Sequence, residues 1–283
     1  MPTENDGRFQ SATLLKYSLV TVLFCTVNVY QIKTNDTSPT LARASLRKAS
    51  AVIVPRKTVK KNKKTIYLSF DDGPNAGTEK LMKILKQEKV PATLFIIGEH
   101  ANGSKAQKAI YDSLLLSEEI ELANHSFTHA HNAYSKFYAN ADSVVTDFRK
   151  CADSFKLKNN IARTPGRNIW RTAKINCTDL KRSTAAADSL YKDGFKLIGW
   201  DLEWHFTNDQ HLIQSDSLMI TQIEEAFSKE RSKTKNMLVL LAHDRSFLSA
   251  GDSGTLHQFI KKLKASNDYE FEQISKYPGL LKE

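Results

Sequence analysis

At residues 65–74 the chain reads Thr65-Ile-Tyr-Leu-Ser-Phe-Asp-Asp-Gly-Pro74. The apolar run Ile66 to Phe70 predicts a buried strand, and the Gly-Pro pair predicts the turn that follows it. The strand therefore ends on two adjacent carboxylates, Asp71 and Asp72. Neighbouring residues of an extended chain point to opposite sides, which lets one aspartate bind a metal while the other accepts a proton. The alternative is a polar turn, because Asp, Gly and Pro are common turn residues.

A second polar run, His125-Ser-Phe-Thr-His129, follows another apolar stretch at residues 120–123. Two histidines four positions apart share one face of a helix or converge in a tight loop, and either arrangement lets them bind one metal ion. One such pair arises easily by chance, but two polar runs that each follow a predicted strand are harder to explain by accident. Asp72, His125 and His129 form a set of ligands that leaves positions open for water and substrate, as a catalytic metal requires.

Four runs, in this order and spacing, resemble the polysaccharide deacetylases, the carbohydrate esterases that include chitin, peptidoglycan and nodulation-factor deacetylases. The runs are Ser69-Phe-Asp-Asp-Gly73, His125-Ser-Phe-Thr-His129, Arg163-Thr-Pro-Gly166 and Leu241-Ala-His243. The resemblance covers roughly residues 64 to 283. Where the family commonly has Arg-Pro-Pro-Tyr-Gly, this chain has Arg163-Thr-Pro-Gly-Arg167. The family's fourth motif ends in Asp-Trp, whereas the nearest match here, Trp200-Asp-Leu-Glu-Trp204, has a glutamate.

Short apolar stretches alternate with amphipathic ones from residue 65 onward, which is typical of parallel βαβ units. The predicted strands are 65–70, 92–98, 119–124, 159–163, 195–200, 237–243 and 269–274. The predicted helices are 77–89, 104–116, 135–156, 183–193, 215–230 and 254–265. The resemblance implies an α/β fold, a distorted and incomplete (β/α) barrel of about seven parallel strands with the helices outside. Each candidate motif follows a predicted strand, and parallel barrels assemble their sites at that end.

The resemblance also implies roles for these residues. Asp72, His125 and His129 would bind one divalent ion, for which zinc fits best and cobalt, nickel or manganese are alternatives. Asp71 would be the catalytic base, and Arg163 would orient its carboxylate and keep it ionised. The metal and a backbone N–H near Pro165–Gly166 would stabilise the oxyanion that forms on the substrate carbonyl.

His243 would be the general acid that protonates the departing amine, because the pKa of histidine lies near neutrality and a carboxylate raises it. Glu203 is the expected carboxylate, with Asp201 as the alternative. Trp204 and Leu241 are expected to line the pocket for the acetyl methyl, although a tryptophan at a strand end is as often part of the core.

The formal net charge of +10 is concentrated in front of the predicted catalytic part. Residues 33–64 hold ten Lys or Arg against one Asp, which leaves about +1 for residues 65–283. A nearly neutral catalytic part argues against nucleic acid as a partner. We therefore expect residues 33–64 to be a basic flexible linker and residues 65–283 to be a monomeric polysaccharide deacetylase domain.

After a short N-terminal tail, residues 1–13, the stretch 14–32 is strongly apolar and just long enough for a membrane span. We interpret it as an uncleaved membrane anchor, with a secretory signal peptide as the alternative. Either one places the catalytic domain outside the cytoplasm, anchored or secreted. There, Cys151 and Cys177 can remain free thiols or form a disulfide, and the sequence leaves both open.

These patterns predict a metal-dependent hydrolase that removes N-acetyl groups from an extracytoplasmic glycan with GlcNAc-type units, such as peptidoglycan, a chitin-like polymer or an exopolysaccharide. A phosphatase with an aspartate nucleophile is one alternative, but it leaves His125, His129 and His243 without a task. A catalytically inactive glycan-binding protein on the same fold is the other, and the unusual third and fourth motifs allow it.

Overall fold

The computed structural model describes residues 63–280. The predicted tail, the apolar segment 14–32 and all but the end of the basic linker lie outside the described residues. Within residues 63–280, no helix has both the length and the apolar character needed to span a bilayer. The first strand begins at Lys64, one residue before the predicted start of the catalytic domain.

The described strands form one sheet in the order β6-β5-β7-β4-β3-β2-β1-β9-β8, with β10 beside β1. All neighbours run parallel except β5, which is antiparallel to β6 and β7. The order has two ends and does not close, so the expected incomplete barrel is confirmed. The strands are β1 Lys64–Gly73, β2 Ala92–Ile96, β3 Ile120–Asn124, β4 Ile161–Ala162, β5 Ile169–Arg171, β6 Asn176–Thr178, β7 Lys196–Leu197, β8 Leu202–Glu203, β9 Met237–His243 and β10 Tyr269–Phe271.

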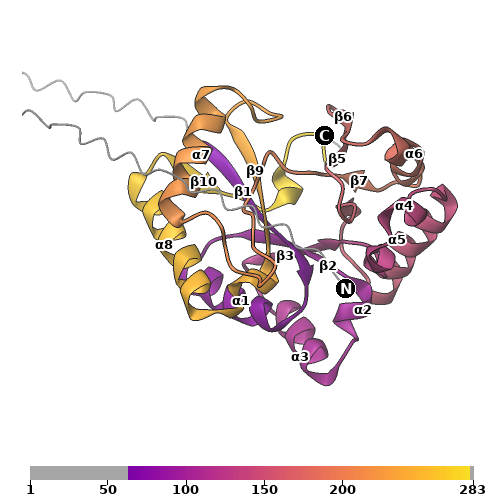
Figure 1. Ribbon diagram of the computed structural model, residues 1–283, viewed down its shortest axis with the longest axis horizontal. Helices are drawn as coiled ribbons and strands as arrows, with labels where there is room; N and C mark the ends of the chain where they lie inside the picture. Colours follow the sequence, from indigo (N-terminus) through magenta and orange to yellow (C-terminus); the bar gives the residue numbers. More distant parts are fainter. Residues whose placement is uncertain (1–62, 281–283) are drawn as a thin grey trace, which may run out of the picture. The chain divides into compact units, whose positions relative to one another are not determined.

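Helices surround the strands on the outside, following one another in chain order (Figure 1). They are α1 Ala76–Glu88, α2 Gly98–Ala101, α3 Lys105–Leu114, α4 Tyr134–Phe137, α5 Ala141–Phe155, α6 Thr184–Lys192, α7 Asp216–Ser228 and α8 Ala250–Ser266, with 3-10 turns η1 His129–Asn132, η2 Lys181–Ser183, η3 Asp244–Leu248 and η4 Ile274–Lys276. The single helix predicted for 135–156 is interrupted, because Asn140 caps α5 by accepting a hydrogen bond from the Ser143 N–H.

Three short strands were not predicted. β5 and β6 form a hairpin in which Trp170 pairs with Cys177, and β8 pairs with β9 through Leu202 and Glu203. Each spans only two or three residues. Such a segment is too short to show the alternation by which a strand is recognised, so its pairing depends on the neighbouring strands.

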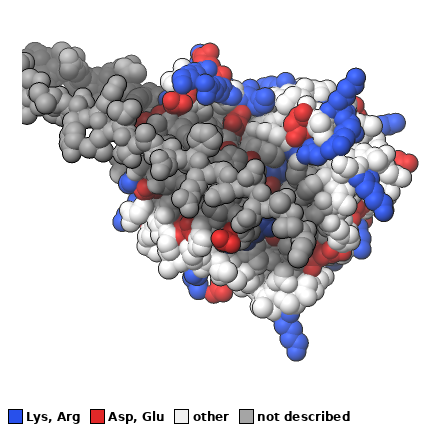
Figure 2. Space-filling model, viewed as in Figure 1, with Lys and Arg blue, Asp and Glu red and all other residues white. Residues whose placement is uncertain are grey.

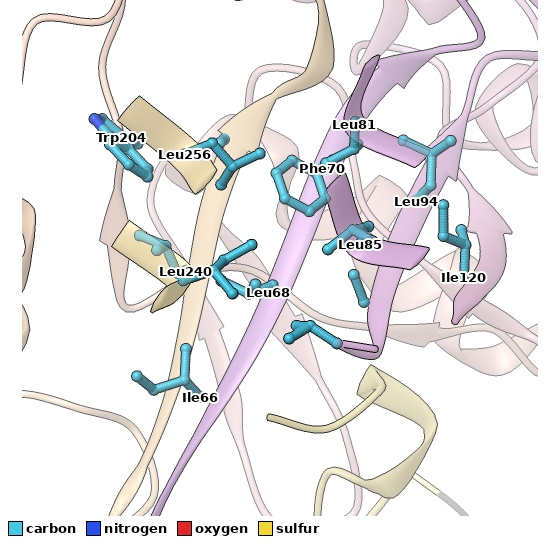
Figure 3. Packing of buried hydrophobic residues seen from close by; sticks show 14 of the residues in the cluster. Ile66, Leu68, Phe70, Leu81, Leu85, Leu94, Ile120, Trp204, Leu240 and Leu256 are labelled. Atoms are coloured by element: carbon cyan, nitrogen blue, oxygen red, sulfur yellow. The ribbon is translucent and has the colours of Figure 1, made fainter. Parts of the chain in front are cut away.

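The side chains of β1 alternate between two environments. Ile66, Leu68 and Phe70 face the helices and pack with residues such as Leu81 of α1 and Leu256 of α8 (Figure 3). Tyr67 belongs to a second cluster on the other face, the interior of the open barrel. Asp71 has the same parity as Tyr67, so the strand directs this carboxylate toward the interior.

β1 is also the strand around which the site forms. β9 pairs with it along one edge from Thr65 to Asp71, where Asp71 lies beside His243. On the other edge β10 pairs with the beginning of β1, and β2 pairs with its end from Ser69 to Gly73. The carboxyl ends of β1, β2 and β9 therefore meet around Asp71.

On the visible part of the described surface, Lys and Arg are mixed with Asp and Glu (Figure 2), in line with the nearly neutral charge of residues 65–283. Cys151 and Cys177 are both free thiols. Cys151 lies in the core, and burial raises its pKa to about 12, so this thiol is unreactive near neutral pH.

Candidate active site

The end of β1 is a bulge. The pairing of β1 with β2 shifts between Asp71 and Gly73, and the intervening Asp72 has a φ of 79°. A bulge changes the direction of a side chain. As a result Asp71 Oδ2 lies 3.6 Å and Asp72 Oδ1 lies 3.5 Å from the same atom, His125 Nε2. The expectation that the two carboxylates point to opposite sides is therefore wrong, because it assumed a regular strand.

The two histidines converge through a tight loop rather than a helix. Ser126 and His129 both have positive φ, 68° and 50°, and the His129 N–H donates to Ser126 Oγ at 3.0 Å. Asp147 of α5 accepts a hydrogen bond from the Phe127 N–H at 3.0 Å. These contacts fix the loop between His125 and His129 and turn both rings toward Asp72.

Asp72 and the two imidazoles form a cluster with metal-ligand geometry. Their ligand atoms all lie within 4.8 Å of one another, and His129 Nε2 is 3.2 Å from Asp72 Oδ1. His125 Nδ1 lies 2.9 Å from the Arg163 carbonyl oxygen. Since a carbonyl only accepts, Nδ1 carries the hydrogen of neutral His125, and the lone pair of Nε2 remains available to a metal ion that Asp72 also binds.

Asp72 Oδ1 is buried without a hydrogen-bond partner. An unpaired buried carboxylate oxygen is costly, and a bound cation removes that cost. Burial alone would raise the pKa of Asp72, but contacts with His125 and His129 hold it far below its usual value. Burial would lower the pKa of His125, yet Asp71 and Asp72 raise it. The cluster thus attracts positive charge, and its donors fit a divalent metal of the zinc type.

Arg163 holds Asp71 in place. It is fully buried, and its NH1 donates to Asp71 Oδ1 and to Ser69 Oγ, each at 2.9 Å. Its other donors reach the carbonyl oxygens of Ile198 and Gly199 at 3.2 and 2.8 Å. Burial lowers the pKa of Arg163 and Asp71 opposes this, but an arginine stays charged in a protein. The expected pairing of Arg163 with Asp71 is present.

Replacing Arg163 by Met should lower the free energy of unfolding by about 3 kcal/mol or more, because Asp71 then becomes a buried charge without a partner. Denaturant unfolding monitored by circular dichroism measures the change. Arg149→Met is the matched control. It breaks the exposed ion pair with Asp193 and should cost less than about 1 kcal/mol. Equal losses in the two variants would contradict the structural role of Arg163.

His243 does not have the expected carboxylate partner. Its Nδ1 is buried and forms no hydrogen bond, and its ring packs on Phe206 with centroids 4.8 Å apart. Glu203 lies 3.7 Å from His205 Nδ1, and Asp201 accepts hydrogen bonds from the Lys233 and Val239 N–H groups. The expectation that Glu203 or Asp201 raises the pKa of His243 is therefore corrected: burial lowers it.

The loop after β4 lies beside the cluster. Tyr138 donates a hydrogen bond to the Pro165 carbonyl oxygen at 2.7 Å, and Gly166 has a φ of 62°. A side chain at Gly166 would meet the ring of Tyr134 at 3.0 Å, and that ring lies 5.8 Å from the ring of His129. The loop of Pro165 and Gly166 is thus connected to the metal-ligand cluster through Tyr134.

Trp204 and Leu241 are separated by the sheet. Trp204 is in the core on the helix side, with its ring 4.9 Å from Phe259 and its indole N–H bonded to the Gln214 carbonyl oxygen (Figure 3). It does not line the site, which corrects that expectation. Leu241 pairs with Ser69, and Ser69 points to the same face of the sheet as Asp71. The side chain of Leu241 therefore also lies on the interior face.

Two further residues of the β9–η3 junction were not predicted. Arg245 NH2 lies 3.2 Å from Asp72 Oδ2. Asp244 is fully buried and accepts hydrogen bonds from Asn75 Nδ2, at 2.6 Å, and from the hydroxyl of Thr78. These bonds join the end of β9 to the start of α1, so they fix the turn behind Asp72. The sequence feature that could have indicated Asp244 and Arg245 is the run of polar residues directly after the buried strand.

Burial raises the pKa of Asp244 to about 7. Protonated Asp244 contributes to the stability of the folded protein. This contribution is fully present below the unfolded-state pKa of about 3.9 and is lost as the pH rises toward the folded-state pKa. Asp244→Asn, which cannot ionise, should therefore become more stable relative to the native protein between about pH 4 and pH 7, by on the order of 4 kcal/mol. Chemical denaturation across that pH range measures the difference. A difference that stays constant with pH would contradict an Asp244 pKa raised by burial.

The structure is thus an open (β/α) barrel with an Asp-His-His cluster that could hold a metal ion at the carboxyl ends of its strands. Residues 58–171 match the family described as polysaccharide deacetylase. The matched residues include Asp71, Asp72, His125, His129 and Arg163, so the likeness extends to this part of the site.

The chain is similar to curated proteins of that description. It is 28% identical over 188 residues to the putative polysaccharide deacetylase YheN of Bacillus subtilis, covering 64% of this chain and 58% of that protein. It is 26% identical over 218 residues to the peptidoglycan-N-acetylglucosamine deacetylase of Bacillus cereus, covering 75% and 70%. The chain thus spans less than two thirds of the length of YheN.

Solved structures share the fold. A Streptococcus mutans CE4 esterase superposes with a TM-score of 0.56 at 24% identity, covering 75% of this chain and 87% of that one. A family 4 carbohydrate esterase from Streptomyces lividans, in complex with acetate, gives 0.54 at 20% identity, covering 76% and 95%. At these identities the likeness concerns the fold alone.

Proposed function

We propose that this protein is a metal-dependent hydrolase that removes N-acetyl groups from a glycan with GlcNAc-type units. The observation that carries the proposal is the arrangement around His125 Nε2: a metal-ligand carboxylate, Asp72, and a carboxylate held by a buried arginine, Asp71, lie 3.5 and 3.6 Å from this one atom. A site that hydrolyses an amide with the help of a metal ion needs a metal ligand and a general base next to each other. The names of the relatives, which include deacetylases of peptidoglycan and of a chitin disaccharide, support the reaction class.

Asp72, His125 and His129 would hold one divalent ion. Two imidazoles and one carboxylate suit zinc best, and cobalt, nickel or manganese accept the same ligands. When bound, the ion supplies Lewis acidity, which polarises the acetamide carbonyl and acidifies water.

The chain's own residues move the protons. Asp71 accepts the proton of the attacking water, and Arg163 keeps its carboxylate ionised and oriented through the 2.9 Å hydrogen bond. The Gly166 N–H donates to no protein acceptor among residues 63–280 and is free to stabilise the oxyanion of the tetrahedral intermediate. His243 protonates the leaving amine. Because burial lowers its pKa, the protonated ring is a stronger acid than an exposed histidine.

A catalytically inactive glycan-binding protein is the second candidate. Nothing at the site favours it, because the metal ligands and the Asp71–Arg163 pair are intact. Incubation of the full chain with a panel of N-acetylated glycans separates the two. We expect acetate and free amine in equal amounts from at least one glycan. Binding without release of either product would support the inactive protein instead.

We further propose that the catalytic domain acts outside the cytoplasm as a monomer, held to the membrane by residues 14–32 or secreted if that segment is cleaved. The apolar character of residues 14–32 and the location of N-acetylated wall glycans support this. A C-terminal reporter that is active only outside the cytoplasm should be active. The basic residues after the segment favour the opposite orientation, so reporter activity confined to the cytoplasm would refute both the topology and wall glycans as substrates.

A further inference from the structure

Arg167 occupies the loop after β4, where the third motif departs from the family pattern. Its Nε is buried without a hydrogen-bond partner, although the rest of the side chain is only half-buried. Its NH1 donates to the adjacent Gly166 carbonyl oxygen at 2.7 Å, and its guanidinium carbon lies 6.0 Å from the centre of the Tyr134 ring. A buried guanidinium N–H without an acceptor is unfavourable, so an acceptor at this position would be stabilising.

Arg245 reaches the same site from the loop after β9. Its NH2 lies 3.2 Å from Asp72 Oδ2, and 44% of its side chain is exposed. Its guanidinium carbon is 5.0 Å from the centre of the Phe206 ring. One edge of this guanidinium thus faces the metal-ligand carboxylate, while the exposed part has donors available for a ligand.

The two arginines approach neighbouring members of the metal-ligand cluster. Arg245 contacts Asp72, which lies 3.2 Å from His129 Nε2, and Arg167 lies beside the ring of Tyr134. The ring itself lies 5.8 Å from the ring of His129. Two guanidinium groups from different loops therefore lie at the edge of the metal-ligand cluster, one beside Asp72 and one beside the tyrosine that packs on His129. Packing on Phe206 and Tyr134 restricts both side chains before any ligand arrives.

Carboxylates near this edge do not neutralise the two arginines. Glu99 pairs with His131, and Glu203 lies beside His205. Asp179 accepts a hydrogen bond from the N–H of Asn168, the residue after Arg167, at 3.0 Å. Asp72 contacts Arg245 but also belongs to the metal-ligand set. With a divalent ion bound there, this edge of the site carries an excess of positive charge.

We propose that Arg167 and Arg245 bind an anionic group, a carboxylate or a phosphate ester, on the glycan next to the N-acetyl group that is removed. This inference rests on the proposed function and specifies its substrate as an acidic glycan. The planar fork of donors on arginine suits both kinds of anion.

Binding affinity tests the proposal independently of turnover. The ligands are an N-acetylated oligosaccharide with a carboxylate on the neighbouring sugar, the same compound as its methyl ester, and an analogue with a phosphate ester at that position. For the full chain, calorimetry should give at least one anionic ligand a Kd about tenfold lower than that of the methyl ester. The ratio should shrink as salt is raised, because screening weakens exposed charge pairs. Whichever anionic ligand has the lower Kd, the carboxylate or the phosphate ester, identifies the group that the two arginines bind. A ratio near one for both anions overturns the proposal.

Variants locate the contact. Arg167→Gln should bring the ratio of the methyl ester's Kd to the anionic ligand's Kd close to one. Arg167→Lys should restore part of the preference for the anion. Arg245→Gln also disturbs Asp72, but that effect acts on all ligands and cancels in the ratio. Arg231→Gln is the matched control, since it removes the same charge at the opposite end of β9. An equal loss in Arg231→Gln would show that net charge alone sets the preference, which overturns the proposal.

The same ligands keep the two proposals apart. Release of acetate from the methyl ester by the native protein tests the deacetylase function, and the ratio of Kd values tests the anion site. Acetate release together with a ratio of one refutes only the anion site. A tenfold ratio without acetate release from any of the ligands supports the anion site and counts against the deacetylase function.

Discussion

Asp71→Asn is expected to lower deacetylation by about 100-fold or more, the usual scale for the loss of a positioned base. The variant should keep its metal, because Asp72, His125 and His129 are unchanged. It should also stay folded, since the carbonyl oxygen of the new asparagine side chain can still accept the hydrogen bond from Arg163. Initial rates of acetate release, with metal content and circular dichroism measured on the same sample, test all three expectations.

Asp72→Asn is the matched comparison, because it makes the same change at the next residue. It replaces an anionic ligand by a neutral one, so metal affinity should fall and excess metal should recover part of the activity. If Asp71→Asn loses the metal and Asp72→Asn retains it, the two roles are exchanged. If neither variant changes the rate, the pair is only a turn and the deacetylase proposal fails.

His125→Ala is expected to lose its metal on dialysis, because the site then keeps only two protein donors. The loss of metal should be larger than for a histidine outside the cluster, because His125 contacts both aspartates and its Nδ1 is bonded to the Arg163 carbonyl oxygen. Elemental analysis of the dialysed variant gives the result. His131→Ala is the control: its side chain is 69% exposed and pairs with Glu99, so occupancy should be unchanged. Full occupancy in His125→Ala would overturn the assignment of the ligands.

The elements predicted from the sequence are those whose pattern is local. β1 and β9 are continuous apolar runs, so Asp71 and His243 could each be placed at the end of a strand. That these two strands are neighbours, with Asp71 beside His243, is known only from the pairing. The resemblance to a family added the barrel. It also supplied the pairing of Asp71 with Arg163, whose positions are 92 residues apart in the chain. No periodicity in the sequence encodes a contact of that range.

What could not be predicted depends on backbone geometry and on distant packing. The bulge at Asp72 changes the direction of one carboxylate, and a one-residue shift leaves no mark on the hydrophobic pattern. Trp204 follows the alternation of β8, a strand of two residues that exists only because β9 lies beside it. Arg245 reaches Asp72 from the far end of the chain, and its position after His243 gave no indication of an ion pair.

Reconstitution with metal tests the central claim most directly. The full chain is stripped with a chelator and titrated with zinc while acetate and free amine are measured on an N-acetylated glycan. We predict no release from the stripped protein, and recovery that saturates at one zinc per chain with equal amounts of the two products. Full activity in the stripped protein, or zinc bound at one per chain by His125→Ala, would contradict a site built from Asp72, His125 and His129.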